Sequence, residues 1–303
     1  ISIIIITLFS ALGCNNLLND ARDAVNTDVY IAGITVNSSD IWVPCYWKNG
    51  ARTDLPMNDA TKSGHSASSI VVADGDVYVG GTSRNSSSKY FPCYWKNGIR
   101  VDIDETNLLD SSKDAQGLAI HVQDGDIYLA GYTTDSSSIQ VPCYWKNGTL
   151  VQLSRKDNTK SGNASSIIVS GGSVYIAGHT TNSSDVQVPC YWKDGVRTDL
   201  SYTQTGGSQC VTASIQVHNG DVYVSGTVVD LTEGSGVPCY WKNGARTDLQ
   251  LNYNGIEGIF GKNIVITGDD IFVSGQVPNR SYVIVPCYWK NGVRTDIADV
   301  IDA

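Results

Sequence analysis

The chain has 303 residues, of which 41% are hydrophobic and 17% are charged, and this composition excludes an intrinsically disordered protein. The net charge is −9 and no basic stretch is present, so nucleic acid is not an expected partner. The content of 30 Gly and 16 Tyr favours strands and turns over helices.

The first 13 residues, from Ile1 to Gly13, are uncharged and strongly apolar. They are too few to span a bilayer as a helix, but they suit the hydrophobic region of an export signal. The segment ends in Ala-Leu-Gly before Cys14, which resembles a bacterial lipobox. We therefore expect an export signal over 1–13 and a lipid-anchored linker over 14–20, with Cys14 carrying the lipid. The alternative is that this segment is a buried N-terminal strand.

A phrase such as VPCYWKNGARTDL (43–55) occurs six times in the rest of the chain, and the cysteines of successive copies are 47 to 50 positions apart. Each copy contains one cysteine and one tryptophan at fixed positions. These residues are Cys45, Trp47, Cys93, Trp95, Cys143, Trp145, Cys190, Trp192, Cys239, Trp241, Cys287 and Trp289. A second phrase such as DVYVGG (76–81) precedes every copy, and a third apolar run such as SIVV (69–72) precedes five of the six. Such regularity identifies a repeat architecture.

Each repeat predicts four short antiparallel strands. Asp-Gly or a similar pair separates the first two strands, and Asn-Gly or Asp-Gly separates the last two; both are strong hairpin signals. Val77, Tyr78 and Val79 are apolar in succession, so both faces of the sheet need cover. We predict an all-β protein, a six-bladed β-propeller with four antiparallel strands per blade, forming one domain over 21–303. A β-solenoid is the alternative, but its coils are usually shorter and lack tight hairpins.

The Asn-Gly turn fixes the pairing of the last two strands. If Asn49 and Gly50 form the loop, then Lys48 faces Ala51, Trp47 faces Arg52, Tyr46 faces Thr53 and Cys45 faces Asp54. Cysteine, tryptophan, arginine and aspartate then share one face, where we expect the arginine to stack on the indole and also to meet the aspartate. In the third repeat Leu150 and Gln152 replace both charged residues together, as a charge pair predicts.

The first blade lacks an obvious inner strand. Residues 21–27 match the pattern of a first strand poorly, and only 298–303 follow the last repeat. We expect Ala298–Ile301 to complete this blade.

The stretch Ser69–Ser83 (SIVVADGDVYVGGTS) and its counterparts resemble bacterial β-propeller repeats of the SBBP type. The YWKNG half is similar to tandem PCYWKNG repeats of secreted or lipid-anchored bacterial proteins whose function is unassigned. The resemblance implies the propeller architecture and export, and it implies nothing about activity, because propellers share shape rather than chemistry.

The recurrent cysteines and tryptophans are interpreted as the structural core of the repeat. Equivalent cysteines of neighbouring blades should lie about 10 Å apart, as packed sheets do, which is too far for a disulfide. Their spacing also lacks a zinc pattern. Cys210, outside the repeat, is the one candidate reactive thiol, and Trp42 is the better candidate for a surface aromatic. The aspartates of the turns are interpreted as turn formers rather than calcium ligands, so neither a metal nor a cofactor is expected.

The strand order places two sets of loops at one end of the propeller. These are the linkers between repeats and the Ser/Asn-rich loops that start at Asn37, Asn85, Asp135 and Asn182. The sequences of the hairpin turns repeat from blade to blade, whereas those of the linkers vary. Variable loops on a rigid frame are where recognition usually occurs. The candidate ligand face comprises His65, Gln116, Asn163, Cys210 and Tyr253. The Ser/Asn-rich loops could bind carbohydrate, or they could simply be turn formers.

These features favour a monomeric binding or scaffolding module for an unknown protein or glycan. We expect it outside the cytoplasm in the bacterial cell envelope, at the periplasmic or outer surface, touching the membrane through its lipid anchor alone. No catalytic residue is assigned, since the four histidines occupy unrelated places and no known catalytic motif is present. Two alternatives stay open: a carbohydrate hydrolase or lyase with an acid/base pair from two linkers, and a purely structural surface repeat protein.

Overall fold

The computed structural model describes residues 4–7, 28–202, 209–230, 235–251, 260–278 and 284–297. These residues form six four-stranded sheets and one short 3-10 helix, η1 (Glu105–Asn107), with no α-helix among them. The prediction of an all-β, six-bladed β-propeller is therefore confirmed. In this described part no helix is long and apolar enough to cross a membrane.

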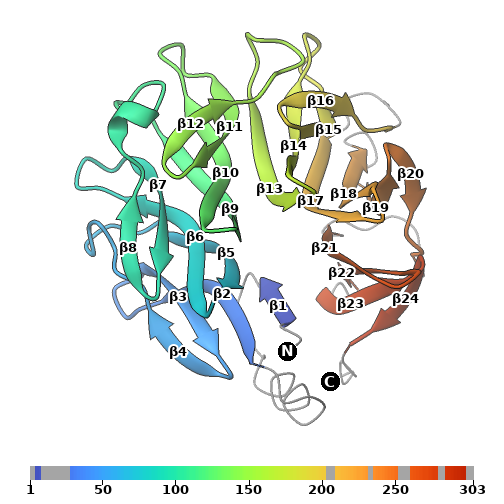
Figure 1. Ribbon diagram of the computed structural model, residues 1–303, viewed down its shortest axis with the longest axis horizontal. Coiled ribbons are helices and arrows are strands. Elements are labelled where there is room, and N and C mark those ends of the chain that lie inside the picture. Colours follow the sequence, from blue (N-terminus) through green and yellow to red (C-terminus); the bar gives the residue numbers. More distant parts are fainter. Residues whose placement is uncertain are drawn as a thin grey trace. The chain divides into compact units, whose positions relative to one another are not determined.

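The chain divides into two compact units, 1–151 and 152–303. The first unit holds three blades, which follow one another from blue to green in Figure 1. Blade 1 contains β1 (Ile4–Thr7), β2 (Val29–Val36), β3 (Trp42–Lys48) and β4 (Ala51–Asp54). Blade 2 contains β5 (Ser66–Ala73), β6 (Asp76–Arg84), β7 (Tyr90–Lys96) and β8 (Ile99–Asp102). Blade 3 contains β9 (Ala115–Gln123), β10 (Asp126–Thr134), β11 (Gln140–Lys146) and β12 (Thr149–Gln152).

The second unit holds the other three blades, from yellow-green to red in Figure 1. Blade 4 contains β13 (Gly162–Ser170), β14 (Ser173–Thr181), β15 (Gln187–Lys193) and β16 (Val196–Asp199). Blade 5 contains β17 (Gln209–His218), β18 (Asp221–Asp230), β19 (Ser235–Lys242) and β20 (Ala245–Asp248). Blade 6 contains β21 (Phe260–Thr267), β22 (Asp270–Pro278), β23 (Ile284–Lys290) and β24 (Val293–Asp296).

The predicted register of the β3–β4 hairpin is confirmed at all four pairs, from Lys48–Ala51 to Cys45–Asp54. Asn49 and Gly50 have φ values of 49° and 82°, as a type I′ turn requires. Asn49 also has a second role: its side-chain oxygen accepts the backbone N–H of Val29 at 2.9 Å, and its amide donates to Asp28 at 2.7 Å. The turn residue therefore also holds the start of the second strand.

The recurrent tryptophan of blades 2 to 6 holds the linker that leads into its own blade. In blades 2 to 6 this residue is buried, and its indole Nε1–H donates to a backbone carbonyl in the linker after the last strand of the preceding blade. The pairs are Trp95–Pro56, Trp145–Asn107, Trp192–Ser154, Trp241–Ser201 and Trp289–Gln250, at 2.6–2.9 Å. Among the recurrent tryptophans, Trp47 of blade 1 is the one that is partly exposed. The indole thus fills the space beside a linker while its one polar group is satisfied.

The recurrent cysteines are all buried, and all are free thiols. Burial raises the pKa of Cys45 and of Cys287 to about 11, so these thiols stay protonated at neutral pH. They act as small apolar side chains in the interior of each blade.

The predicted charge pair is present, but the predicted stacking is not. Arg52 Nε donates to the Asp54 carboxylate at 2.5 Å, and the equivalent pairs recur in blades 2, 4, 5 and 6. Within the described residues, no cation–ring contact joins the arginine to the tryptophan. The repeat lysine lies over an aromatic ring of the second strand instead, as Lys48 does over Tyr30 at 5.3 Å. This lysine also pairs with Asp28 or its equivalent in five blades.

The inner strand of the first blade differs from the expected one. β1 (Ile4–Thr7) pairs in parallel with β2, whereas we expected Ala298–Ile301 beside it. Isoleucine has a high strand propensity, and this favours the N-terminal segment at that edge. Ala298–Ile301 and Cys14 lie outside the described residues, so export and lipidation remain predictions.

Candidate functional site

The structure separates the five residues of the predicted ligand face. Gln116 lies opposite Tyr132, and Asn163 lies opposite His179. Each directly precedes the residue that faces the recurrent glycine of the second strand, Gly131 or Gly178. Cys210 lies opposite Val228, one position earlier in its strand. Tyr253 lies outside the described residues. Gln116, Asn163 and Cys210 are therefore in first strands rather than in linkers, and only His65 is in a linker.

Cys210 therefore points to the opposite face from Gln116 and Asn163, because neighbouring side chains of a strand alternate between the two faces of the sheet. His65 and Cys210 are completely buried, while Gln116 and Asn163 are partly exposed. Cys210 packs in the core of blade 5, where burial raises its pKa to about 12. The hypothesis that Cys210 is a reactive thiol is therefore wrong, because a buried, protonated thiol is a poor nucleophile.

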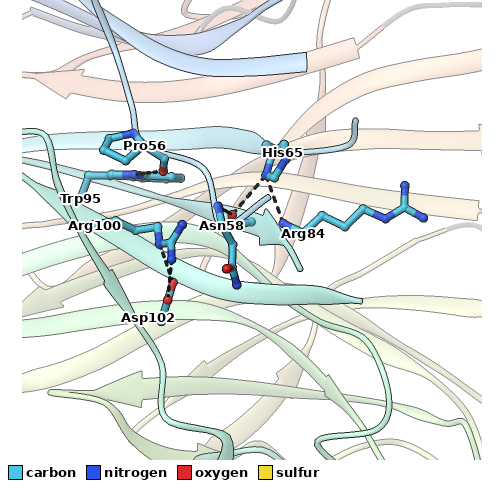
Figure 2. A network of polar contacts seen from close by, with 8 residues as sticks. Pro56, Asn58, His65, Arg84, Trp95, Arg100 and Asp102 are labelled. Atoms are coloured by element: carbon cyan, nitrogen blue, oxygen red, sulfur yellow. Dashed lines mark hydrogen bonds and ion pairs between the residues drawn. The ribbon is translucent and has the colours of Figure 1, made fainter. Parts of the chain in front are cut away.

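His65 is the centre of a polar network that holds the linker before β5 (Figure 2). Its Nδ1 accepts the backbone N–H of Arg84 at 3.1 Å, and its Nε2 lies 3.0 Å from the carbonyl oxygen of Asp59. The Ser83 hydroxyl lies 3.1 Å from Nδ1 and accepts the backbone N–H of Asn58 at 2.9 Å. Nδ1 must keep its lone pair in order to accept the N–H of Arg84, and Nε2 must carry a proton in order to donate to the carbonyl of Asp59. The imidazole is therefore neutral. Burial also lowers the pKa of His65, which agrees with this assignment.

The network fixes Arg84, whose side chain extends away from the imidazole in Figure 2. Its Nε donates to the carbonyl of Ser88 at 3.0 Å, and its Nη1 donates to the carbonyl of Ser63 at 3.1 Å. The guanidinium lies 5.1 Å from the centroid of the Tyr90 ring. Two backbone acceptors and one ring therefore hold it in a single orientation.

Ser63 also connects Arg84 to an exposed aromatic residue. The Ser63 hydroxyl accepts the backbone N–H of Trp42 at 3.2 Å, so the start of β3 meets the linker that leads into blade 2. The Trp42 side chain is 46% exposed, as predicted, and Val36 opposite it is 58% exposed. Trp42 and Val36 are two exposed apolar residues beside the polar loop after β2, and such a pair is a candidate surface for binding a ligand.

We call this group the Trp42 surface, and it comprises Val36, Trp42, Ser63, Gly64, Arg84 and Tyr90. Gly64 has a φ of +99°, and a Cβ there would come within 2.9 Å of the Tyr90 hydroxyl, so only glycine permits the close approach of that ring. All six residues belong to the first unit.

The aromatic residues are peculiar to blades 1 and 2. The positions of Trp42 and Tyr90 are taken by Gln140 in blade 3 and by Gln187 in blade 4. The position of Arg84 is taken by Thr134 and Thr181. An alignment of the repeats on their Pro-Cys pair reveals these substitutions, and this signal could have identified Arg84 and Tyr90 from sequence.

The Ser/Asn-rich loops use their polar groups internally. In the loop after β2, the Asn37 side-chain oxygen accepts the backbone N–H groups of Ser39 and Ile41 at 2.9 and 3.0 Å. Asp135 and Asn182 form the same pair of bonds in their own loops. This agrees with the interpretation of these residues as turn formers.

The linkers also repeat more than expected. Asp59, Asp110 and Asp157 each accept the backbone N–H and the hydroxyl of the residue two positions later, at 2.6–2.9 Å. These hydroxyls lower the pKa of all three carboxyls. Each aspartate therefore shapes its linker as an acceptor in a tight turn.

The clear pKa shifts among the carboxyls of the described residues all have the same direction. Every carboxyl there whose pKa clearly departs from its usual range is shifted downward, by lysine ammonium groups or by turn hydroxyls. In the same residues no group of three or more His, Cys, Asp and Glu side chains could hold a metal ion.

The buried His65 and the half-buried His121 and His179 predict a loss of stability on mild acidification. Burial lowers the pKa of His65 and His121, and that of His179 to about 4. Between pH 6.5 and pH 4 the unfolded chain binds protons that the folded chain excludes, so the free energy of unfolding falls through this window. At about 1.4 kcal/mol per pH unit, His179 alone accounts for up to about 3 kcal/mol.

Urea unfolding at pH 7.0 and pH 4.5 measures this loss. In blade 6 the position equivalent to His179, opposite the repeat proline, carries Gln276. The fold therefore accommodates glutamine at this position, and His179→Gln is a suitable variant. This variant should lose less stability between the two pH values than the unmodified chain. An equal loss in both proteins would contradict the assignment to His179.

No family model and no curated protein matches this chain. Several solved structures resemble it in fold. A polysaccharide lyase of a new family, an ulvan lyase, is 11% identical with a TM-score of 0.55, over 88% of this chain and 79% of that one. The β-propeller domain of the Trilobed protease from Pyrococcus furiosus is 12% identical with a TM-score of 0.52, over 90% and 79%. A thermostable family-43 glycoside hydrolase is 10% identical with a TM-score of 0.50, over 78% and 93%. These structural similarities support the β-propeller fold. At identities of 10–12%, they do not indicate an activity for this chain.

Proposed function

We propose that this protein is a carbohydrate-binding β-propeller that contacts its ligand through the Trp42 surface. The observation that carries the proposal is that Ser63 connects an indole, 46% exposed, to a guanidinium: its hydroxyl accepts the backbone N–H of Trp42, and its carbonyl is one of the two that hold Arg84. Sugar rings present apolar C–H faces and polar edges, so they match an aromatic ring flanked by hydrogen-bond donors. The repeats supply a rigid frame, and the surface lies where the repeats differ from one another.

A binding role agrees better with the described residues than a hydrolytic one. A glycoside hydrolase requires two carboxyl groups, one of them protonated near neutral pH. The positions facing each other on the first and second strands carry Gln116 and Tyr132 in blade 3, and Asn163 and His179 in blade 4. None of these side chains is a carboxylic acid.

The place of action is part of the same proposal. An export signal over 1–13 and a lipid on Cys14 would hold the propeller at the cell envelope, where polysaccharides are abundant ligands. Removal of the signal would also remove β1, so blade 1 of the mature protein would keep β2, β3 and β4. Multiple acyl chains give firm attachment, whereas one chain gives only weak binding.

Replacement of the exposed indole tests the proposal. We expect the chain to bind at least one of a panel of soluble polysaccharides, and Trp42→Ala to weaken that binding at least tenfold, because aromatic anchors dominate such contacts. Isothermal titration calorimetry measures the affinity. The substitution should leave the fold intact, since the side chain is half exposed.

Val196→Ala is the matched control, because Val196 is an apolar residue, 71% exposed, on another blade. It should bind as the unmodified chain does. No binding to any polysaccharide would refute the proposal, and equal binding by Trp42→Ala would place the site elsewhere. Release of new reducing ends during incubation would instead establish the hydrolase or lyase.

A further inference from the structure

The guanidinium of Arg84 keeps donors that the protein does not use. An arginine side chain has five N–H groups in a planar fork. In the described part of the chain, one N–H of Arg84 is donated to Ser88 and one to Ser63. The other three have no protein acceptor there, although the cation is held firmly by its contacts.

A second cation adjoins this group. Lys62 immediately precedes Ser63, and its ammonium makes no ion pair or hydrogen bond within the described residues. Its equivalents in the next two linkers are engaged: Lys113 donates to the Ser138 hydroxyl at 3.1 Å, and Lys160 pairs with Asp185 at 2.6 Å. The Lys62 side chain is the one of these three that remains available to a ligand.

These cations stand out because the protein as a whole has a net charge of −9. Two nearby acids bind neutral groups rather than these cations: Asp59 accepts the amide and hydroxyl of Thr61, and Asp114 accepts the backbone N–H of Tyr90 at 3.0 Å. Neither forms an ion pair with Arg84 or Lys62 within the described residues, so the charged ligand that these two cations attract is expected to be an anion. A planar carboxylate matches the fork of a guanidinium better than a neutral hydroxyl does.

We propose that the Trp42 surface selects acidic polysaccharides and that Arg84 is the residue that recognises the carboxylate of a uronic acid. The indole of Trp42 packs against a sugar ring, the free N–H groups of Arg84 donate to the carboxylate, and Lys62 adds long-range attraction. This inference rests on the proposed function, because it names the class of glycan bound at the same surface.

Polygalacturonate and the same polymer after reduction of its carboxyl groups form the test pair. Calorimetric titration should show the unmodified chain binding the acidic polymer at least tenfold more tightly, with an affinity that falls as salt rises. Arg84→Gln should reduce this preference to within about twofold, since it removes the charge-assisted hydrogen bonds to the carboxylate. Arg84→Lys should keep part of the preference, because it retains the charge without the fork.

Arg155→Gln is the matched control. Arg155 is a linker arginine of the second unit, and its Nη1 donates to the carbonyl of Lys160 at 3.2 Å, as Arg84 does to Ser63. This variant should keep the full preference. Lys62→Gln breaks no contact in the described structure and should lower the preference for the acidic polymer about twofold to threefold. It therefore tests the role of the cations even if Arg84→Gln unfolds.

The outcomes separate the two proposals. Equal binding of both polymers by the unmodified chain would overturn the selection of acidic glycans and leave the proposed function standing. Preference for the acidic polymer that survives Arg84→Gln, Arg84→Lys and Lys62→Gln would also overturn the role of these cations. Failure to bind any member of the polysaccharide panel would remove the proposed function itself.

Discussion

Replacing Trp192 by alanine is expected to lower the free energy of unfolding by about 3–5 kcal/mol, the usual result of truncating a buried aromatic residue. The Trp192 side chain has no exposed surface. Its Nε1 donates to the carbonyl of Ser154 at 2.9 Å, so the same residue fills the space beside a linker and holds that linker in place. Equilibrium urea unfolding followed by circular dichroism measures the change.

Two further variants separate packing from hydrogen bonding. Trp192→Phe keeps an aromatic ring but removes the N–H, and an unsatisfied buried carbonyl costs about 1–3 kcal/mol. Trp42→Ala removes an indole that is 46% exposed, and it should cost less than about 1 kcal/mol. A similar loss for Trp42→Ala and Trp192→Ala would contradict the role of the repeat tryptophan in holding the linker before its blade.

Replacing Gly131 by alanine is expected to cost about 3 kcal/mol or more and to disrupt blade 3. A Cβ at this position would lie 1.8 Å from the carbonyl oxygen of Gln116, which is backbone and cannot rotate away. The cause is a bulge: the register between β9 and β10 shifts next to Gly131, so the backbones approach closely there. Thermal unfolding measures the effect.

Gly171→Asn is the matched control for this substitution. Gly171 lies in a turn with a φ of 57°, a Cβ added there would meet no atom within 4 Å, and other repeats carry Asp or Asn at this position. This variant should be as stable as the unmodified chain, or up to about 1 kcal/mol more stable, because asparagine tolerates this conformation and loses less chain entropy. Equal stability of Gly131→Ala and Gly171→Asn would contradict the steric account of the repeat glycine.

The sequence could predict whatever depends on neighbours along the chain. The Asn49-Gly50 turn determined the hairpin register because its two residues require positive φ, and the pairing of Arg52 with Asp54 followed from that register. The burial of the recurrent cysteines and tryptophans followed from apolar residues on both faces of each strand.

Features that depend on a bulge or on a neighbouring blade were not predictable in this way. The bulge shifts the register of the first strands, so Cys210 was assigned to an accessible linker although it is buried in a strand. The contact of Ser63 with Trp42 and Arg84 joins residues 21 positions apart on each side, and no local pattern indicates it. The parallel strand β1 was not predictable either, because an uncharged apolar segment suits an export signal as well as it suits a strand.

Fluorine NMR of the chain labelled with 5-fluorotryptophan tests the central claim most directly. The chain has 7 Trp, and the signal that is lost in Trp42→Phe belongs to the exposed indole. On titration with polygalacturonate, this signal should shift or broaden while those of the buried tryptophans stay in place. An unchanged Trp42 signal in the presence of bound polymer would contradict the assignment of the binding site to the Trp42 surface.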